Sequence, residues 1–271
     1  MRPAASTCVA SRLRGARDVT MADAMVASDV AGWVAGFFLS PVTGLISTAR
    51  HARMFHPRGV LCAGEAEPAS PAMRLVGARL AGPVLVRWSS ALWKHGEWHD
   101  VLGCALRFTQ APFTPEAAPA DQDLLLATIQ RPWTMPLSPF TTDVRDFLSN
   151  AYFGVSPFHV EPLGRSEWRL TASGGESGPG TRAERLARAI DEGSAELVLS
   201  CAPYPGPLRR PRKAAFEPVV KIRLGALVAL DDERLRFDPF RNGRGIHPVG
   251  FVHHMRRAAY RASQAARPER G

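Results

Sequence analysis

The chain has 271 residues, a formal net charge of +9, a hydrophobic fraction of 45% and a charged fraction of 22%. These values are typical of a folded protein, exclude an intrinsically disordered one, and allow one domain built on a β-barrel. The positive charge would suit nucleic acid or an anionic membrane. Because the arginines are scattered and no nucleic-acid-binding motif accompanies them, no nucleic-acid partner is expected.

The N-terminal fifth of the sequence divides into two parts. Residues 1–20 are polar and carry arginines, and we interpret them as a disordered or non-native extension, with Met21 as an alternative start. Residues 21–50 are predicted to form an apolar helical segment, in which a charged residue and a proline interrupt the apolar stretch at 24–46. A membrane-spanning helix needs roughly 20 uninterrupted residues. This pattern favours a helix that packs on the protein or touches a membrane surface, in a cytoplasmic protein.

Short apolar runs after this segment predict strands at 58–64, 83–89, 102–108, 123–129, 195–201, 218–224 and 226–230. Loops are predicted at 110–121 and 173–180, where proline, glycine and serine concentrate. Thr181 and Glu184 have the spacing of a capping box, which predicts a helix that ends near Gly193. A last helix is predicted at 249–266. The fold class predicted is α+β, with an antiparallel β-barrel flanked by helices.

The four cysteines are widely spaced, which excludes a CxxC motif and a zinc-type cluster. Cys62 and Cys104 lie within apolar runs, and we predict that both are buried thiols. Such thiols suit a reducing cytoplasm.

Three separated segments contain residue types that carry chemistry. In chain order they are residues 53–64, which begin Arg53-Met54-Phe55-His56, then Val86-Arg87-Trp88-Ser89, then residues 216–267, which include Phe237-Asp238-Pro239, Arg256, Tyr260 and Arg267. On a helix, Arg256 and Tyr260 share one face at the i, i+4 spacing. A guanidinium group beside a phenol favours the charged tyrosinate by direct attraction. Each segment alone is typical of ordinary surface or ion-paired residues. The functional interpretation therefore rests on the occurrence of all three segments in this order.

In this order the three segments resemble those that build the haem pocket of the catalase family. The resemblance spans about residues 50–267 and implies that 51–271 form a catalase-like haem-binding barrel domain. It implies a small member of the family, without the N-terminal arm and C-terminal domain of large catalases. The resemblance implies haem b, with its iron bound by Tyr260 and with Arg256 beside the phenolate. It further implies distal catalytic roles for His56 and Ser89, and propionate binding by Arg53, Arg87 and Arg267.

The sequence departs from the family at the distal asparagine pair, which in catalases follows an Asp-Leu-Val strand. The comparable stretch of this chain starts at Asp123 and contains no asparagine, so Thr128 or Gln130 would have to supply a polar contact. The expected activity therefore moves from rapid disproportionation towards peroxidase or weak catalase activity. The expected substrates are hydrogen peroxide and organic hydroperoxides, including lipid hydroperoxides, with an unidentified electron donor.

Two alternatives from other classes remain open. One is a catalase-fold haem-binding or structural protein without redox turnover, which the missing asparagine favours. The other is a hydrolase such as a phosphodiesterase, although the sequence contains no nucleophile elbow and no phosphate-binding loop. No oligomeric state is assigned from the sequence.

Overall fold

The computed structural model of the protein describes residues 59–91, 97–110, 113–131, 134–154, 156–173, 178–206, 216–230, 234–250 and 253. Its strands are β1 (Gly59–Pro68), β2 (Gly82–Ser90), β3 (Leu102–Phe108), β4 (Gln122–Ala127), β5 (Tyr152–Phe153), β6 (Phe158–Val160), β7 (Gly164–Ser173), β8 (Glu196–Pro203), β9 (Glu217–Leu227) and β10 (Ile246–Pro248). Its helices are η1 (Pro71–Met73), α2 (Arg74–Leu80), α3 (Ser138–Thr141) and α4 (Arg182–Asp191).

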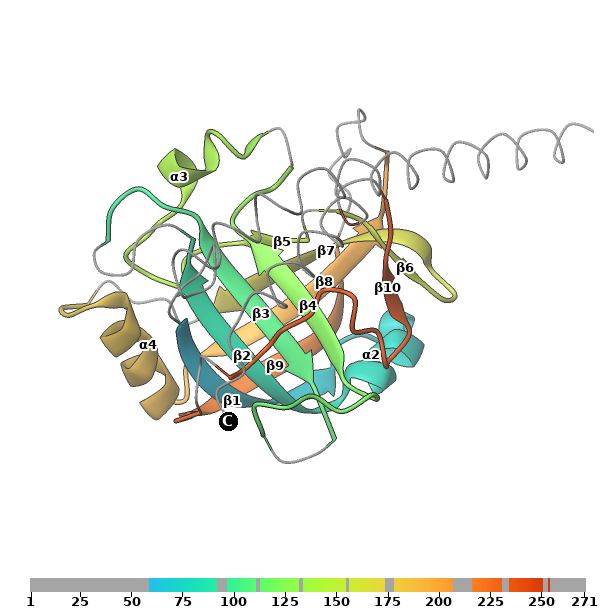
Figure 1. The fold of residues 1–271 in the computed structure, drawn as a ribbon, viewed down its shortest axis with the longest axis horizontal. Coiled ribbons are helices and arrows are strands. Elements are labelled where there is room, and N and C mark those ends of the chain that lie inside the picture. Colours follow the sequence, from blue (N-terminus) through green and yellow to red (C-terminus); the bar gives the residue numbers. More distant parts are fainter. Residues whose placement is uncertain are drawn as a thin grey trace, which may run out of the picture.

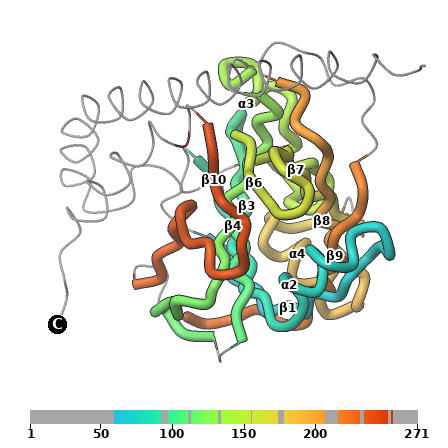
Figure 2. Tube along the Cα trace, turned by 90° about the vertical axis from the view of Figure 1, so that its right-hand side faces the viewer, coloured from blue at the N-terminus to red at the C-terminus, as the bar shows by residue number. Residues whose placement is uncertain are grey.

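Within these ranges, eight antiparallel strands close into a barrel (Figure 1). The strand order is β7-β5-β4-β3-β2-β1-β9-β8, and β8 pairs back with β7 to close the ring. Strand β6 pairs with β7, and β10 runs beside β6 at the side of the barrel (Figure 2). The predicted α+β class with an antiparallel barrel core is confirmed.

Alternation of side chains along the strands separates the barrel interior from its outer face. On β2, Val84, Val86 and Trp88 are fully buried in the main hydrophobic core. The Trp88 ring lies 5.6 Å from the ring of Phe147 and 5.3 Å from that of Tyr152, measured between centroids. A core filled by aromatic side chains leaves the interior packed, so any ligand site must lie on the outer face or at an end of the barrel.

Helix α4 begins as the sequence predicts. The Thr181 hydroxyl accepts the N–H of Glu184 at 3.4 Å, and the Glu184 carboxylate accepts the N–H of Thr181 at 2.7 Å, which completes the capping box. The helix ends two residues before Gly193, whose φ of 68° suits glycine. Its buried side chains are Leu186, Ala189 and Ile190.

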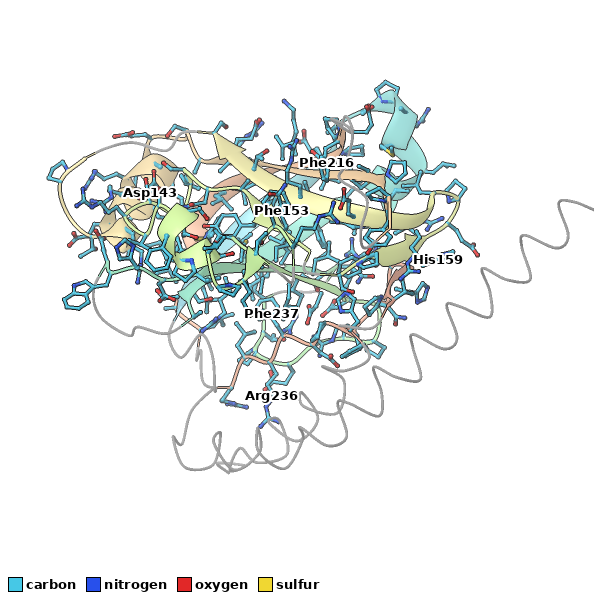
Figure 3. The ribbon with its side chains drawn as sticks, turned by 90° about the horizontal axis from the view of Figure 1, so that it is seen from above. Asp143, Phe153, His159, Phe216, Arg236 and Phe237 are labelled. Atoms are coloured by element: carbon cyan, nitrogen blue, oxygen red, sulfur yellow. The ribbon has the colours of Figure 1, made fainter. Side chains whose placement is uncertain are left out.

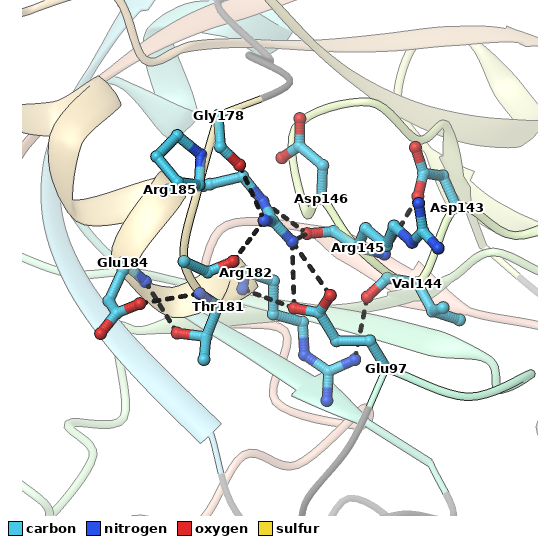
Figure 4. A network of polar contacts seen from close by, with 12 residues as sticks. Glu97, Asp143, Val144, Arg145, Asp146, Gly178, Thr181, Arg182, Glu184 and Arg185 are labelled. Atoms are coloured by element: carbon cyan, nitrogen blue, oxygen red, sulfur yellow. Dashed lines mark hydrogen bonds and ion pairs between the residues drawn. The ribbon is translucent and has the colours of Figure 1, made fainter.

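A carboxylate from the loop after β2 holds the first turns of α4 (Figure 4). Both oxygens of Glu97 accept from Nη2 of Arg185, at 3.0 and 3.1 Å. One of the same oxygens accepts the backbone N–H of Arg182 at 2.7 Å. The Arg182 guanidinium group also donates to the carbonyl of Val144 at 3.0 Å. The helix is therefore tied to two loops that are distant in the sequence.

The structure corrects the sequence-based prediction at several elements. Strand β9 is continuous through Gly225, whereas two strands at 218–224 and 226–230 were predicted. The sequence analysis missed β5, β6, β7, β10, α2 and α3. Strand β7 was missed because three charged residues on its outer face obscure the inward Trp168 and Leu170.

Residues 1–58 lie outside the described residues, so the division of the chain at 20 and 50 stays a prediction. Of the helix predicted at 249–266, only 249, 250 and 253 are described, and His253 is helical and buried. Among the described helices, none has the length and apolar character needed to cross a bilayer.

A buried ion-pair network attaches the segment before β10 to the outer face of β3 and β4. The carboxylate of Asp123 accepts from Nε and Nη2 of Arg107, at 3.0 and 3.3 Å. It also accepts the backbone N–H of Asp238 at 2.8 Å and pairs with Arg241. The Arg107 guanidinium group lies 4.8 Å from the centroid of the Phe237 ring. One buried carboxylate thus pairs with two guanidinium groups and accepts a hydrogen bond from a backbone N–H group.

We expect Asp123→Ala to lower the free energy of unfolding by about 3–5 kcal/mol, because it leaves the charges of Arg107 and Arg241 without their carboxylate. Glu116→Ala is the matched control. Its 2.9 Å ion pair with Arg234 joins the same two parts of the chain, but both side chains are 66% exposed. The control is expected to lose less than about 1 kcal/mol. Urea unfolding measures both values. Equal losses would contradict a special role of the buried Asp123 network.

Candidate functional site

The outer face of β1–β4 carries Arg87 and Ser89, the predicted site residues that lie within the described part of the chain. Both alternate on β2 with the inward Val86 and Trp88, so they point away from the barrel interior. Each is only 5% exposed. The structure therefore places a guanidinium group and a hydroxyl group side by side in a buried position.

Small residues surround Arg87 and Ser89 across the strands. Ser89 stands between Gly59 of β1 and Gly103 of β3, and Gly103 in turn pairs with Ala127 of β4. Arg87 stands in the adjacent row, between Leu61 and Ala105, and Ala105 pairs with Leu125. In these two rows of four strands, Arg87 and Ser89 carry the only polar side chains. One guanidinium group and one hydroxyl group thus lie among small and apolar side chains.

Gly59 allows Arg87 to lie close to β1. A Cβ atom at position 59 would stand 2.7 Å from Cζ and Nε of Arg87 and 2.8 Å from the carbonyl oxygen of Trp88. The guanidinium group therefore rests on the glycine backbone, where no larger residue fits without displacement. Gly59 belongs to the first sequence segment, so the structure brings the described part of that segment beside the second.

The third sequence segment also reaches this face. Leu235 and Phe237 pack with Leu61 and Leu85 in a second hydrophobic cluster outside the barrel. Figure 3 shows Arg236 and Phe237 on this side of the molecule. Parts of all three segments, which are far apart in the sequence, thus meet on one wall of the barrel.

The other predicted site residues are Arg53, His56, Arg256, Tyr260 and Arg267. They lie outside the described residues, so their roles stay predictions. Within the described ranges, no group of three or more histidine, cysteine, aspartate or glutamate side chains is placed to hold a metal ion.

Thr128 and Gln130 were the two residues expected to supply a polar contact in place of the distal amide. Thr128 is hydrogen-bonded elsewhere, and Gln130 faces solvent. The Thr128 hydroxyl accepts the N–H of Leu102 at 3.1 Å and the hydroxyl of Thr142 at 2.7 Å. Gln130 is exposed. Ala127, which shares the row of Ser89, offers no polar group. Neither Thr128 nor Gln130 therefore replaces the distal amide on this face.

The three described cysteines are buried thiols, which confirms the prediction for Cys62 and Cys104 and adds Cys201. Burial raises the pKa of Cys62 to about 12 and that of Cys201 to about 11. Burial also raises the pKa of Cys104 well above its usual range. These thiols stay protonated near neutral pH, so none of the three supplies a reactive thiolate.

Two cavities lie near this wall, and neither is lined by Arg87 or Ser89. A cavity of about 40 Å³ lies beside Arg107 and Asp121, with room for little more than a water molecule. A hollow of about 540 Å³ between β1 and β9 is lined by charges of both signs, including Glu65, Glu67 and Arg223.

No family model matches the chain, and no curated protein matches it in sequence. Among solved structures, the crystal structure of a fungal catalase is similar, with a TM-score of 0.53 and 13% sequence identity. The match covers 79% of this chain and about 60% of that catalase, so the chain spans less than two thirds of the length of its structural neighbour. At this identity the likeness concerns the fold alone, and it shows that the barrel is catalase-like.

Gly59→Ala is expected to lower the free energy of unfolding by about 1–3 kcal/mol, because the new methyl group must displace Arg87 or the Trp88 carbonyl. Gly225→Ala in β9 is the matched control. A Cβ there would meet only the carbonyl oxygen of Ala63, at 4.0 Å. Chemical denaturation of the two variants gives the comparison. A loss at Gly225 as large as that at Gly59 would show that the close approach of Arg87 is unimportant.

Proposed function

We propose that the chain is a haem b-binding protein that reduces hydroperoxides, as a peroxidase or weak catalase. One observation carries this proposal. Parts of the three catalase-like sequence segments meet on the outer face of β1–β4, where Arg87 and Ser89 lie buried among glycine, alanine and leucine. The catalase-like fold supports the proposal, and the iron ligand, Tyr260, is taken from the sequence resemblance.

The residues on this face fit a haem group. Gly59, Gly103 and Ala105 form a floor without bulky side chains, which suits a flat macrocycle. The guanidinium group of Arg87 would hold a propionate through charge-assisted hydrogen bonds. Arg53 and Arg267 would hold propionates in the same way, and Arg256 would keep Tyr260 in its charged form. When bound, the haem iron supplies the redox chemistry at the peroxide oxygen.

Proton transfer is the task of the chain's own residues in this proposal. The imidazole of His56 would accept the proton of the hydroperoxide and return it to the departing oxygen. The hydroxyl of Ser89 would orient that imidazole by a hydrogen bond. Gly59, which pairs directly with Ser89, follows His56 by only three residues, and this short separation in the sequence supports the proposed contact.

The absence of an amide near Ala127 shapes the expected specificity. Without a donor to orient a small peroxide, rapid disproportionation of hydrogen peroxide is not expected. The side chains beside Arg87 and Ser89 on this wall are apolar or absent, including the half-buried Leu125, which favours organic hydroperoxides over hydrogen peroxide.

Protein produced with added haem precursor is expected to show a haem absorption band with tyrosinate-type charge-transfer features. Tyr260→Phe should lose or shift these features, because phenylalanine supplies no ligand to iron. Tyr204→Phe, on the opposite wall of the barrel, is the matched control and should keep the wild-type spectrum. A wild-type protein that neither carries haem nor can be reconstituted with it would refute the proposal.

Ser89→Ala is expected to lower kcat/KM for cumene hydroperoxide about tenfold with haem content unchanged, because one orienting hydrogen bond of about 1.4 kcal/mol is lost. Ser200→Ala provides the control, since Ser200 is similarly buried on β8. Steady-state peroxidase assays on haem-loaded protein measure the difference. If haem is bound but no hydroperoxide is reduced, the chain is a haem-binding protein without turnover.

A further inference from the structure

The outer face of β7 carries two arginines on the wall opposite the proposed haem face. Arg165 and Arg169 alternate with the fully buried Trp168 and Leu170, so both point out of the barrel. Phe216, which contacts Arg169, and Phe237, on the haem face, lie on opposite sides of the molecule in Figure 3. This second face is therefore separate from the site described above.

The Nε–H group of each arginine has no hydrogen-bond acceptor among the described residues. Nε of Arg165 and Nε of Arg169 are both buried without a hydrogen-bond partner. Their contacts are with aromatic rings, since Cζ of Arg165 lies 5.2 Å from the Tyr204 centroid and Cζ of Arg169 lies 4.3 Å from the Phe216 centroid. A ring attracts a guanidinium charge but satisfies few of its five donors.

The carboxylate that lies between the two arginines on the strand already forms an ion pair with another residue. Glu167 lies between them on the same face, and its Oε2 pairs with Nη1 of Arg131 at 3.1 Å. Its other oxygen is buried without a partner. Burial raises the pKa of Glu167, while Arg131 opposes that shift. Glu167 thus pairs with Arg131, and no ion pair to Arg165 or Arg169 is formed among the described residues.

We propose that the outer face of β7 binds an anionic ligand whose phosphate or carboxylate groups accept hydrogen bonds from Arg165 and Arg169. The two arginines are four steps apart along the strand, a distance of about 13 Å between their Cα atoms. That spacing is too long for a single small anion, so the ligand presents at least two anionic groups. A short polyphosphate chain and a row of anionic lipid headgroups share this chemistry.

The test compares Arg165→Gln/Arg169→Gln with the wild-type protein on two probes. The first probe is a short linear polyphosphate, measured by calorimetric titration. The second is vesicles of phosphatidylglycerol and phosphatidylcholine in equal parts, measured by co-sedimentation against pure phosphatidylcholine. We expect at least about tenfold weaker binding in the double variant, because each guanidinium group contributes charge-assisted hydrogen bonds.

Arg74→Gln/Arg223→Gln is the matched control, since it removes the same charge at two exposed positions on α2 and β9. It is expected to keep binding within about twofold of the wild type. Polyphosphate binding that depends on Arg165 and Arg169 identifies a free ligand, and vesicle binding alone with that dependence identifies lipid headgroups. Either result supports the proposal. No binding of either probe, or an equal loss in the control, overturns it.

Glu167→Gln gives a second test of opposite sign. Removing the local carboxylate makes this face more positive and should strengthen binding of the effective probe several-fold. Unchanged or weaker binding by this variant overturns the proposal, and the test remains available if the double variant does not fold. All these measurements can be made on protein with or without haem. Their outcome therefore does not depend on the proposed peroxidase function.

Discussion

The buried carboxylate of Asp123 is the interaction on which the candidate site depends. Its bonds to Arg107, Arg241 and the backbone of Asp238 hold residues 235–241 against the outer face of β3 and β4. Held there, Leu235 and Phe237 can cover Leu61 and Leu85, which gives the face its apolar character. A buried ion pair of this kind adds little net stability compared with apolar residues, but its geometry demands one arrangement of the chain.

Closure of the barrel gives the protein two walls with different chemistry. In the two rows that hold Arg87 and Ser89, the wall of β1–β4 otherwise carries glycine, alanine and leucine. The wall of β7 presents arginines stacked on aromatic rings. Because the interior is filled by tryptophan, tyrosine and aliphatic side chains, neither wall shares a cavity with the other. Two separate binding functions are therefore compatible with one small domain.

The departure from catalases at Ala127 has a local structural cause. The position of Thr128 in the sequence made it a candidate to replace the distal amide. Its hydroxyl instead accepts hydrogen bonds from the N–H of Leu102 and the hydroxyl of Thr142. In the row of Ser89, β3 contributes Gly103 and β4 contributes only the methyl group of Ala127. The row of Ser89 therefore carries no amide on β3 or β4.

The sequence by itself determined the features that depend on neighbours along the chain. The spacing of Thr181 and Glu184 predicts the start of α4, and apolar runs predict β1 to β4 and β8, because caps and strand alternation are local. Only the tertiary structure decided which distant residues meet. It placed Gly59 under Arg87, engaged Thr128 with Leu102, and joined Arg165 and Arg169 to Tyr204 and Phe216. These contacts follow from strand register and barrel closure, which depend on pairing between segments far apart in the sequence.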